Sequence, residues 1–230
     1  MLEDSLFFPM ALSLLAWTAG AALHRRFRTA LCSPLLIAVL LTMAVLWGLD
    51  VPYESYYRGA QPLHWLLTPA TICLALPLWE NAARLRRHWK AVLAGIAAGM
   101  AAALTGIWAM SHACGLSYGA YATLLPKSIT AAIGMDVSAG LGGDVSLTAA
   151  AIILTGILGN MFAELWSRLF HLRDPVARGV AIGSSAHAIG TAKAAEMGET
   201  EGAASSLAMV VTGLFTVAAV PFFAGLFIGG

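Results

Sequence analysis

Residues 91–126 read AVLAGIAAGMAAALTGIWAMSHACGLSYGAYATLLP, a stretch without a single Asp, Glu, Lys or Arg. Three further stretches also lack these charges, and they lie between Arg28 and Asp50, between Asp144 and Glu164, and after Gly202. Each can hold the roughly 20 apolar residues with which a helix crosses a hydrocarbon layer about 30 Å thick. The pattern therefore predicts an all-α, polytopic membrane protein.

The composition supports the same class. Of the 230 residues 59% are hydrophobic and 11% are charged, with a mean hydropathy of +0.79. An average soluble domain has about 25% charged residues, so this chain cannot cover a water-exposed surface. The formal net charge of +1 gives no reason to expect a nucleic-acid partner. We interpret the widely spaced Cys32, Cys73 and Cys114 as small core thiols, and we expect no metal and no cofactor.

Eight apolar segments can be placed along the chain, and they cover residues 6–23, 31–49, 63–80, 90–111, 117–135, 145–167, 176–194 and 203–228. Basic residues cluster in the first, third and sixth connections, around 24–28, 84–90 and 168–178. Short loops rich in Lys and Arg stay in the cytoplasm, so these three connections are expected inside.

Eight full crossings would place the basic sixth connection outside. We therefore predict that segment 117–135, which contains Pro126 and Lys127, enters from outside and returns without crossing. Segment 176–194 is polar and is predicted to be a matching broken or re-entrant hairpin, although a full crossing stays open for it. The expected result is about six full transmembrane helices and two hairpins, with both termini outside.

An internal repeat agrees with this arrangement. A shift of 57 positions places Thr155-Gly156 on Thr212-Gly213, and it places residues 126–130 on 183–187. In the predicted topology the two copies have opposite orientations, and inverted repeats with broken helices are typical of secondary transporters. We expect residues 63–230 to form this core and residues 1–62 to form a helical pair for scaffolding or oligomerisation.

The first polar stretch runs from Pro126 to Thr130. Pro126 removes a backbone donor, and backbone groups left free at membrane depth are tolerated only inside protein or beside a water-filled cavity. Lys127 adds a cation, which either snorkels to the interface or pairs with Asp136 or Glu164 as structural glue, or binds an anionic substrate. On the last interpretation Pro126, Lys127, Ser128 and Thr130 are substrate-binding residues.

The second polar stretch runs from Gly179 to Lys193. Its small residues are common where helices pack closely, and a single histidine is often a satisfied core residue. His187, however, lies between hydroxyls and glycines in a segment too polar to face lipid, and its ring titrates near neutral pH. We interpret five residues here as substrate-binding: Ser184, Ser185, His187, Gly190 and Thr191. His187 is also a candidate for proton coupling, as are Asn160 and Glu164, although Glu164 can equally pair with Arg168.

Four strings together resemble the LrgB/CidB family, and they begin at Pro126, Ala177, Ser185 and Glu201: PKSIT, ARG, SAHAIGT and EGAASSLA. The resemblance implies a multi-pass protein of the bacterial inner membrane. It implies either transport of small hydroxy- or oxo-monocarboxylates, such as pyruvate, glycolate or glycerate, or antiholin-like control of murein hydrolase export and lysis. In the second role an LrgA/CidA-type membrane protein is the expected partner.

A buried cation beside hydroxyls and a histidine favours the carrier over the regulator, because a scaffold needs none of these groups. We expect Lys127 to neutralise a substrate carboxylate and the hydroxyls to contact its other oxygen. An intramembrane hydrolase that uses Ser184 or Ser185 with His187 remains an alternative, but no acidic residue lies nearby in sequence to orient the imidazole. We therefore predict a non-enzymatic carrier, with the lipid bilayer and a second copy of the chain as further partners.

Overall fold

The computed structural model describes residues 7–27, 34–66, 69, 72–73 and 75–228, and within these ranges the regular structure is entirely helical. The chain divides into two compact units, Met1–Cys73 and Leu74–Gly230. The division falls within the segment predicted as the third span, eleven residues after the domain boundary expected at residue 62.

The first unit contains α1 (Phe7–Phe27), α2 (Pro34–Gly48), α3 (Tyr53–Gly59) and α4 (Gln61–Trp65). Helices α1 and α2 approach closely at Gly20, where a Cβ atom would lie 2.6 Å from the carbonyl oxygen of Pro34. The hydroxyls of Ser13 on α1 and Tyr56 on α3 are 2.8 Å apart and link these two helices. Helices α1 and α2 therefore pack against each other.

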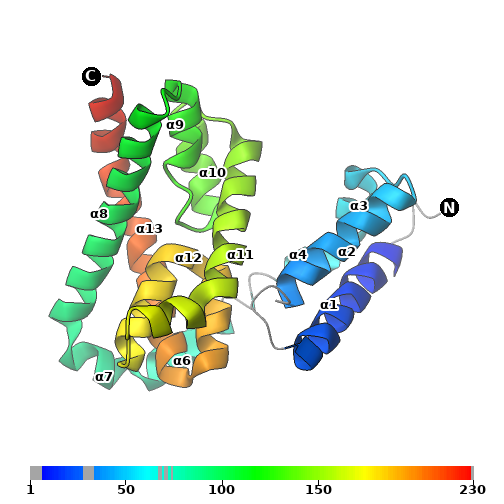
Figure 1. Ribbon diagram of the computed structural model, residues 1–230, viewed down its shortest axis with the longest axis horizontal. Coiled ribbons are helices and arrows are strands. Elements are labelled where there is room, and N and C mark those ends of the chain that lie inside the picture. The colour runs from blue at the N-terminus through cyan, green and yellow to red at the C-terminus, as the bar shows by residue number, and fades with distance from the viewer. Residues whose placement is uncertain (1–6, 28–33, 67–68, 70–71, 74, 229–230) are drawn as a thin grey trace. The chain divides into compact units, whose positions relative to one another are not determined.

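The second unit contains two short helices, α6 (Ala75–Glu80) and α7 (Ala82–Arg87), followed by three long ones, α8 (Trp89–Ala113), α11 (Val145–Leu169) and α13 (Glu199–Ile228). In Figure 1, α8 and α13 run upward in this unit. Helix α11, which comes between them in the sequence, runs downward. The start of α11 follows directly from the sequence, because the carboxylate of its N-cap residue Asp144 accepts a hydrogen bond from Leu147 N at 2.9 Å.

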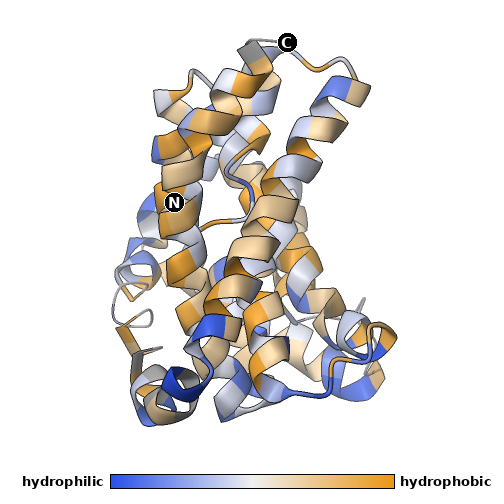
Figure 2. Cartoon of the chain, turned by 90° about the vertical axis from the view of Figure 1, so that its left-hand side faces the viewer, coloured by the Kyte–Doolittle hydropathy of each residue, from blue (hydrophilic) through white to orange (hydrophobic). Residues whose placement is uncertain are grey.

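Four described helices are long and apolar enough to cross a membrane: α1, α8, α11 and residues 199–227 of α13. Large apolar side chains on their outer faces are exposed, among them Leu154 on α11 and Leu214 on α13, with exposed fractions of 57% and 64%. Figure 2 shows hydrophilic residues gathered toward the lower ends of the helices. Such a surface suits lipid and not water, so the helical membrane class is confirmed.

Two interrupted elements lie between the long helices. Helix α9 (Tyr118–Leu124) and helix α10 (Ala131–Gly140) are joined by the non-helical residues 125–130. Helix α12 (Pro175–Met197) is broken at His187, whose φ of 43° and ψ of −139° are not helical. Gly190 lies against Ile182, with 3.0 Å between its hypothetical Cβ and Ile182 Cγ2, so the two arms of α12 fold back on each other.

The structure corrects three boundaries. The span predicted over residues 63–80 is interrupted at Leu66, because α4 ends at Trp65 and Leu66 forms a turn; residues 67–68, 70–71 and 74 lie outside the described ranges. The first hairpin continues to Gly140, not to residue 135, because the exposed Asp136 is accommodated on the surface of α10. The second broken segment covers 175–197 in place of 176–194.

Candidate functional site

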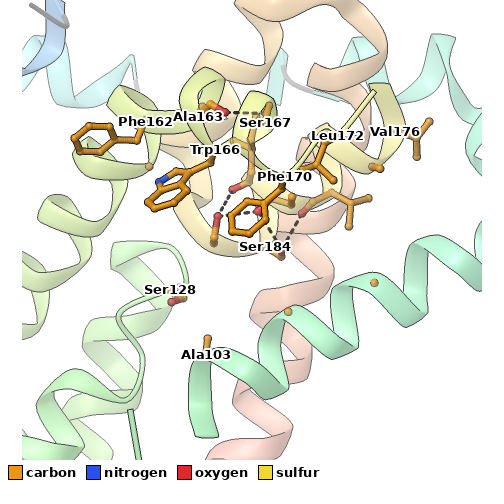
Figure 3. A pocket seen from close by; sticks show the side chains of 18 of the residues that line it. Ala103, Ser128, Phe162, Ala163, Trp166, Ser167, Phe170, Leu172, Val176 and Ser184 are labelled. Carbon is orange, nitrogen blue, oxygen red and sulfur yellow. Dashed lines mark hydrogen bonds between the residues drawn. The ribbon is translucent and has the colours of Figure 1, made fainter. Parts of the chain in front are cut away.

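The tips of the two interrupted elements lie in the interior of the second unit. The α9–α10 hairpin descends from the upper end in Figure 1, and the arms of α12 rise from the lower end. Lys127 and Ser128 from the first tip line one cavity together with Ser184 and Ser185 from α12. This cavity has a volume of about 1100 Å3. In Figure 3, Ser128 and Ser184 project from separate elements toward the same space.

Pro126 sets the geometry of the first tip. It is fully buried and carries no N–H, so α9 ends just before it. The chain then turns, and the Ile129 N–H donates to the Pro126 carbonyl at 3.2 Å. Lys127 is held at this turn, and its Nζ lies 3.4 Å from the hydroxyl of Ser128. Within the described ranges, no carboxylate forms an ion pair with Lys127. The ammonium therefore faces the cavity without a counter-ion from these residues.

The opposite wall supplies hydroxyls. Ser184 Oγ donates to Val180 O at 2.8 Å, and Ser185 Oγ donates to Ala181 O at 2.7 Å, so both oxygens keep lone pairs that can accept a hydrogen bond. Thr155 on α11 also lines the cavity and was not predicted as a site residue. The internal repeat was the available signal, because it singled out Thr155 and Gly156 among many apolar neighbours.

His187 lies next to this cavity and not among the residues that line it. It is 3% exposed, and its Nε2 is 2.8 Å from the carbonyl oxygen of Ile152 on α11. A carbonyl only accepts, so Nε2 carries a proton and Nδ1 is the position that can gain or lose one. Lys127 lines the cavity, and His187 lies on the same helix as the cavity-lining Ser184 and Ser185.

Gly156 makes room for the imidazole. A Cβ atom at this position would lie 2.6 Å from His187 Cε1 and 2.9 Å from its Nε2, closer than real atoms approach. The second glycine of the repeat, Gly213 on α13, faces the first hairpin, with 3.5 Å between its hypothetical Cβ and Ile133 Cδ1. The glycine of each Thr-Gly pair thus contacts the hairpin that belongs to the other copy of the repeat. Gly156 on α11 contacts α12, and Gly213 on α13 contacts α10.

Four other predicted site residues occupy supporting positions outside the cavity lining. Pro126 shapes the first tip, and Thr130 is the N-cap residue of α10, although its side chain makes no cap hydrogen bond. Gly190 permits the close approach of the two arms of α12. Thr191 Oγ1 donates to His187 O at 2.8 Å and lies 2.9 Å from Ser205 Oγ, so its hydroxyl is engaged within the protein.

The two candidate coupling residues on α11 bind the second arm of α12. Asn160 Nδ2 donates to Ile189 O at 3.3 Å, and Glu164 forms an ion pair with Lys193 at 3.0 Å. Glu164 also lies 3.4 Å from Arg168, the pairing that the sequence offered as its structural role. The ion pair with Lys193 was not predicted, since nothing in their spacing along the chain indicates that these two residues meet.

The cavity extends from the polar tips toward the lower ends of the helices. His88 and Asp174 line it there, at the starts of α8 and α12, and aromatic side chains of Trp166 and Phe170 cover part of its wall (Figure 3). The polar groups are thus concentrated at the inner end of a largely apolar passage. Within the described part of the chain, no group of three His, Cys, Asp or Glu residues is placed to hold a metal ion.

A family model described as LrgB-like family matches residues 13–226, nearly the whole chain. The chain belongs to the LrgB-like family. The match confirms the membership expected from the four motif strings, and in this LrgB-like protein two of those strings lie on the hairpin tips described above. No solved structure was found to match the LrgB-like chain.

Proposed function

We propose that this protein transports small hydroxy- or oxo-monocarboxylates, of the pyruvate, glycolate and glycerate class, across the bacterial inner membrane. One observation carries the proposal: Lys127 and Ser128 share a cavity with Ser184 and Ser185, although the two pairs come from hairpins that enter from opposite ends. A cation to which the described residues supply no counter-ion, in a cavity lined by hydroxyls, suits a carboxylate that bears a second oxygen.

The arrangement supports a specific binding mode. The Lys127 ammonium and the Ser128 hydroxyl would hold the carboxylate. Ser184 and Ser185, whose protons are donated to backbone carbonyls, would accept from a substrate hydroxyl, and the Thr155 hydroxyl would donate to a keto oxygen. The substrate's negative charge would offset the repulsion between Lys127 and a protonated His187. Binding of the anion and binding of a proton would therefore favour each other, as in a proton symporter.

The fold supports alternating access. A broken hairpin followed by a long helix occurs twice, in opposite directions, which is the construction expected of an inverted-repeat carrier. The cavity leads to the connection between α11 and α12, which contains Arg173 and is flanked by Arg168 on α11 and Arg178 on α12. Because basic loops stay in the cytoplasm, the described state would be open inward.

Uptake of labelled pyruvate and glycolate into proteoliposomes tests the proposal. Lys127→Ala should reduce uptake by at least about 10-fold, because a charge-assisted hydrogen bond contributes about 1.5–3 kcal/mol. Lys90→Ala removes an exposed cation that lies outside the cavity lining and is the matched control. Equal uptake by the Lys127→Ala variant and the native protein would refute this site.

Family membership also supports a second function, the antiholin-like control of murein hydrolase export together with an LrgA/CidA-type partner. A regulator should alter autolysis in cells grown without any small monocarboxylate, and the purified protein should transport none. A carrier should show the opposite pair of results. The half-buried Lys127 ammonium, for which the described residues supply no counter-ion, favours the carrier, because desolvating a charge is costly and a scaffold gains nothing from it.

A hydrolase receives less support from the geometry. Both candidate nucleophiles donate to carbonyls of their own helix, and the His187 Nε2 proton is directed at Ile152 O and not at a serine. Nucleophilic catalysis needs a base that accepts the proton of the nucleophile. A hydrolytic activity that survives in the Ser184→Ala/Ser185→Ala double variant would remove these serines as nucleophiles and with them the hydrolase hypothesis.

A further inference from the structure

Thr212 on α13 has a buried hydroxyl that the proposed site does not use. The residue is 1% exposed, and its Oγ1 has no hydrogen-bond partner among the described residues. Buried hydroxyls are nearly always paired, since an unpaired one loses its bonds to water without compensation. This hydroxyl is therefore available for a hydrogen bond to a ligand, and Thr212 does not line the cavity described above.

The position of Thr212 along α13 places it between the two hairpins. At 3.6 residues per turn, one stripe of the helix contains Ser205, Met209, Thr212, Thr216, Val220 and Phe223. Its lower part meets the second hairpin, because Ser205 and Met209 both contact Thr191. Its upper part meets the first hairpin, because Val220 packs with Tyr121 and Leu125. Thr212 and the buried Thr216 lie at the level where the tips meet.

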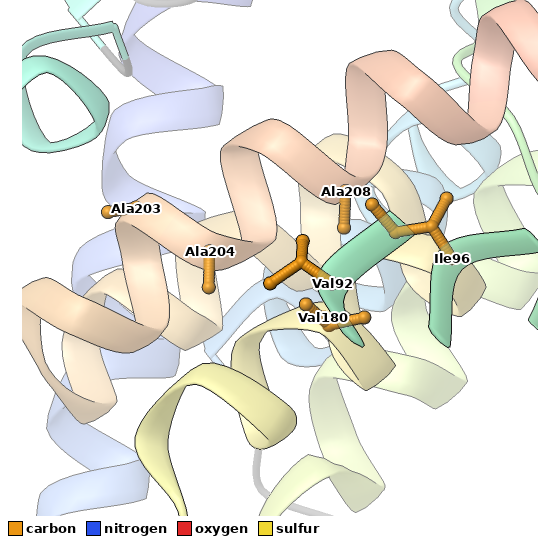
Figure 4. Packing of buried hydrophobic residues seen from close by; sticks show 6 residues of the cluster. All are labelled: Val92, Ile96, Val180, Ala203, Ala204 and Ala208. Atoms are coloured by element: carbon orange, nitrogen blue, oxygen red, sulfur yellow. The ribbon is translucent and has the colours of Figure 1, made fainter. Parts of the chain in front are cut away.

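A neighbouring face of α13 is committed to packing. Ala204 and Ala208 pack against Val92 and Ile96 of α8 and against Val180 of α12 (Figure 4). This contact is apolar and tight, with no polar group to bind a ligand. The stripe that carries Thr212 is therefore the polar side of α13, and it is turned toward the hairpins.

The internal repeat relates Thr212 to the existing cavity. The shift of 57 positions places Thr155, which lines the cavity, on Thr212, and it places Lys127 and Ser128 on Ser184 and Ser185. The shift thus maps the two tip residues of the first hairpin onto the two of the second. It also maps α11, which forms one wall of the cavity, onto α13. In an inverted-repeat carrier the two access states are related by this exchange.

The α13 side is closed in the described state by aromatic packing. Tyr121 donates its hydroxyl proton to the Phe223 carbonyl at 3.0 Å, and its ring stacks on Phe227 with 4.4 Å between centroids. Leu104 and Ile107 of α8 complete this cluster. Separation of the cluster would uncover Thr216 first and Thr212 behind it.

We propose that Thr212, with Thr216 beside it, is a second binding position for the hydroxyl or keto oxygen of the carboxylate, occupied when the cavity opens to the opposite side of the membrane. The inference rests on the proposed transport function. Thr155 serves the substrate on one side, and Thr212 serves it on the other, while Lys127 holds the carboxylate in both states.

Sided transport kinetics test this inference. With pyruvate or glycolate supplied to proteoliposomes of defined orientation, Thr212→Val should raise KM about 3- to 10-fold on the face opposite the described opening. Thr155→Val should raise KM on the other face, Thr212→Ser should restore the native value, and the exposed Thr105→Val is the matched control. Equal effects of Thr212→Val on both faces, or none, would overturn the assignment.

Thiol labelling separates this inference from the transport function. In a chain whose Cys32, Cys73 and Cys114 are replaced by serine, Thr155→Cys and Thr212→Cys should react with an impermeant maleimide from opposite faces of the membrane. Such labelling without uptake of any carboxylate would refute the proposed substrate class but would support an access path along α13. Labelling of both positions from one face only would overturn the path even if uptake is measured.

Discussion

At the residue scale, the centre of the molecule depends on one strained histidine and the glycine beneath it. His187 is a non-glycine residue with φ of 43°, in a region that costs about 1–3 kcal/mol and persists only when its surroundings enforce it. Burial of the ring and the 2.8 Å bond from Nε2 to Ile152 O provide that enforcement. Gly156 leaves the space in which the ring lies.

Replacing Gly156 with alanine should destabilise the protein by about 1–3 kcal/mol, because the added methyl group collides with the imidazole. The measurement is the apparent melting temperature of the detergent-solubilised protein. Gly106→Ala is the matched control, since nothing lies within 4 Å of a Cβ atom on that exposed position of α8. If the Gly156→Ala and Gly106→Ala variants have the same apparent melting temperature, the steric role of Gly156 is disproved.

Two substitutions of His187 separate backbone strain from side-chain bonding. His187→Ala and His187→Gly both lose the bond to Ile152, but glycine adopts positive φ freely and alanine does not. The glycine variant should therefore be the more stable of the two by about 1 kcal/mol. Thermal melting of the two proteins provides the comparison. A less stable glycine variant would mean that the unusual φ of His187 carries little strain.

At the scale of elements, an ion pair joins the start of α12 to the start of α13. Arg178 and Glu201 are 2.8 Å apart, and the Glu201 side chain is 7% exposed. Gly179 permits the contact, because a Cβ atom there would lie 2.4 Å from the Glu201 carbonyl oxygen. Both residues belong to the motif strings that indicated the family, so those strings mark packing as well as the hairpin tips.

Breaking this pair from one side should be costly. Arg178→Met leaves the buried Glu201 carboxylate without its partner, and removing one partner of a buried pair costs about 3–5 kcal/mol. The double variant Arg178→Met/Glu201→Leu should be the more stable protein, because no buried charge remains. A double-mutant cycle of melting temperatures or of folded yield measures the difference. Additive losses in the double variant would show that the two side chains act independently.

At the scale of the whole molecule, the orientation in the membrane follows from the basic connections. The basic connections around residues 84–90 and 168–178 are expected inside. Helix α8 begins at the first of these connections, so Cys114, which follows its other end, is expected outside. Cys114 is exposed, so it can report its side of the membrane directly.

Labelling of intact cells with an impermeant maleimide tests this topology. Cys114 should react in intact cells of a Cys32→Ser/Cys73→Ser variant. A thiol introduced by Arg173→Cys in a chain without native cysteines should react only after the inner membrane is permeabilised. The reverse pattern would invert the orientation and would place the described opening of the cavity on the outer side.

The amino-acid sequence alone determined the membrane class, the family and the positions of both interruptions. These properties depend on neighbouring residues: charge-free runs long enough to span lipid, a proline at 126, and a cluster of small polar residues around His187. Local composition was less informative for residues 63–80, where apolarity predicted one span and the structure has a turn at Leu66 after the short helix α4. Apolar composition reports burial in lipid, and it does not report helix continuity.

Only the tertiary structure decided which of these groups meet. The cavity shared by Lys127 and Ser184 and the ion pair of Glu164 with Lys193 join elements far apart in the chain. Such contacts are set by how closely the helices approach. That approach depends on glycines such as Gly156, because a side chain from another element occupies the space that a larger residue would fill. Residue spacing along one helix carries no information about that partner.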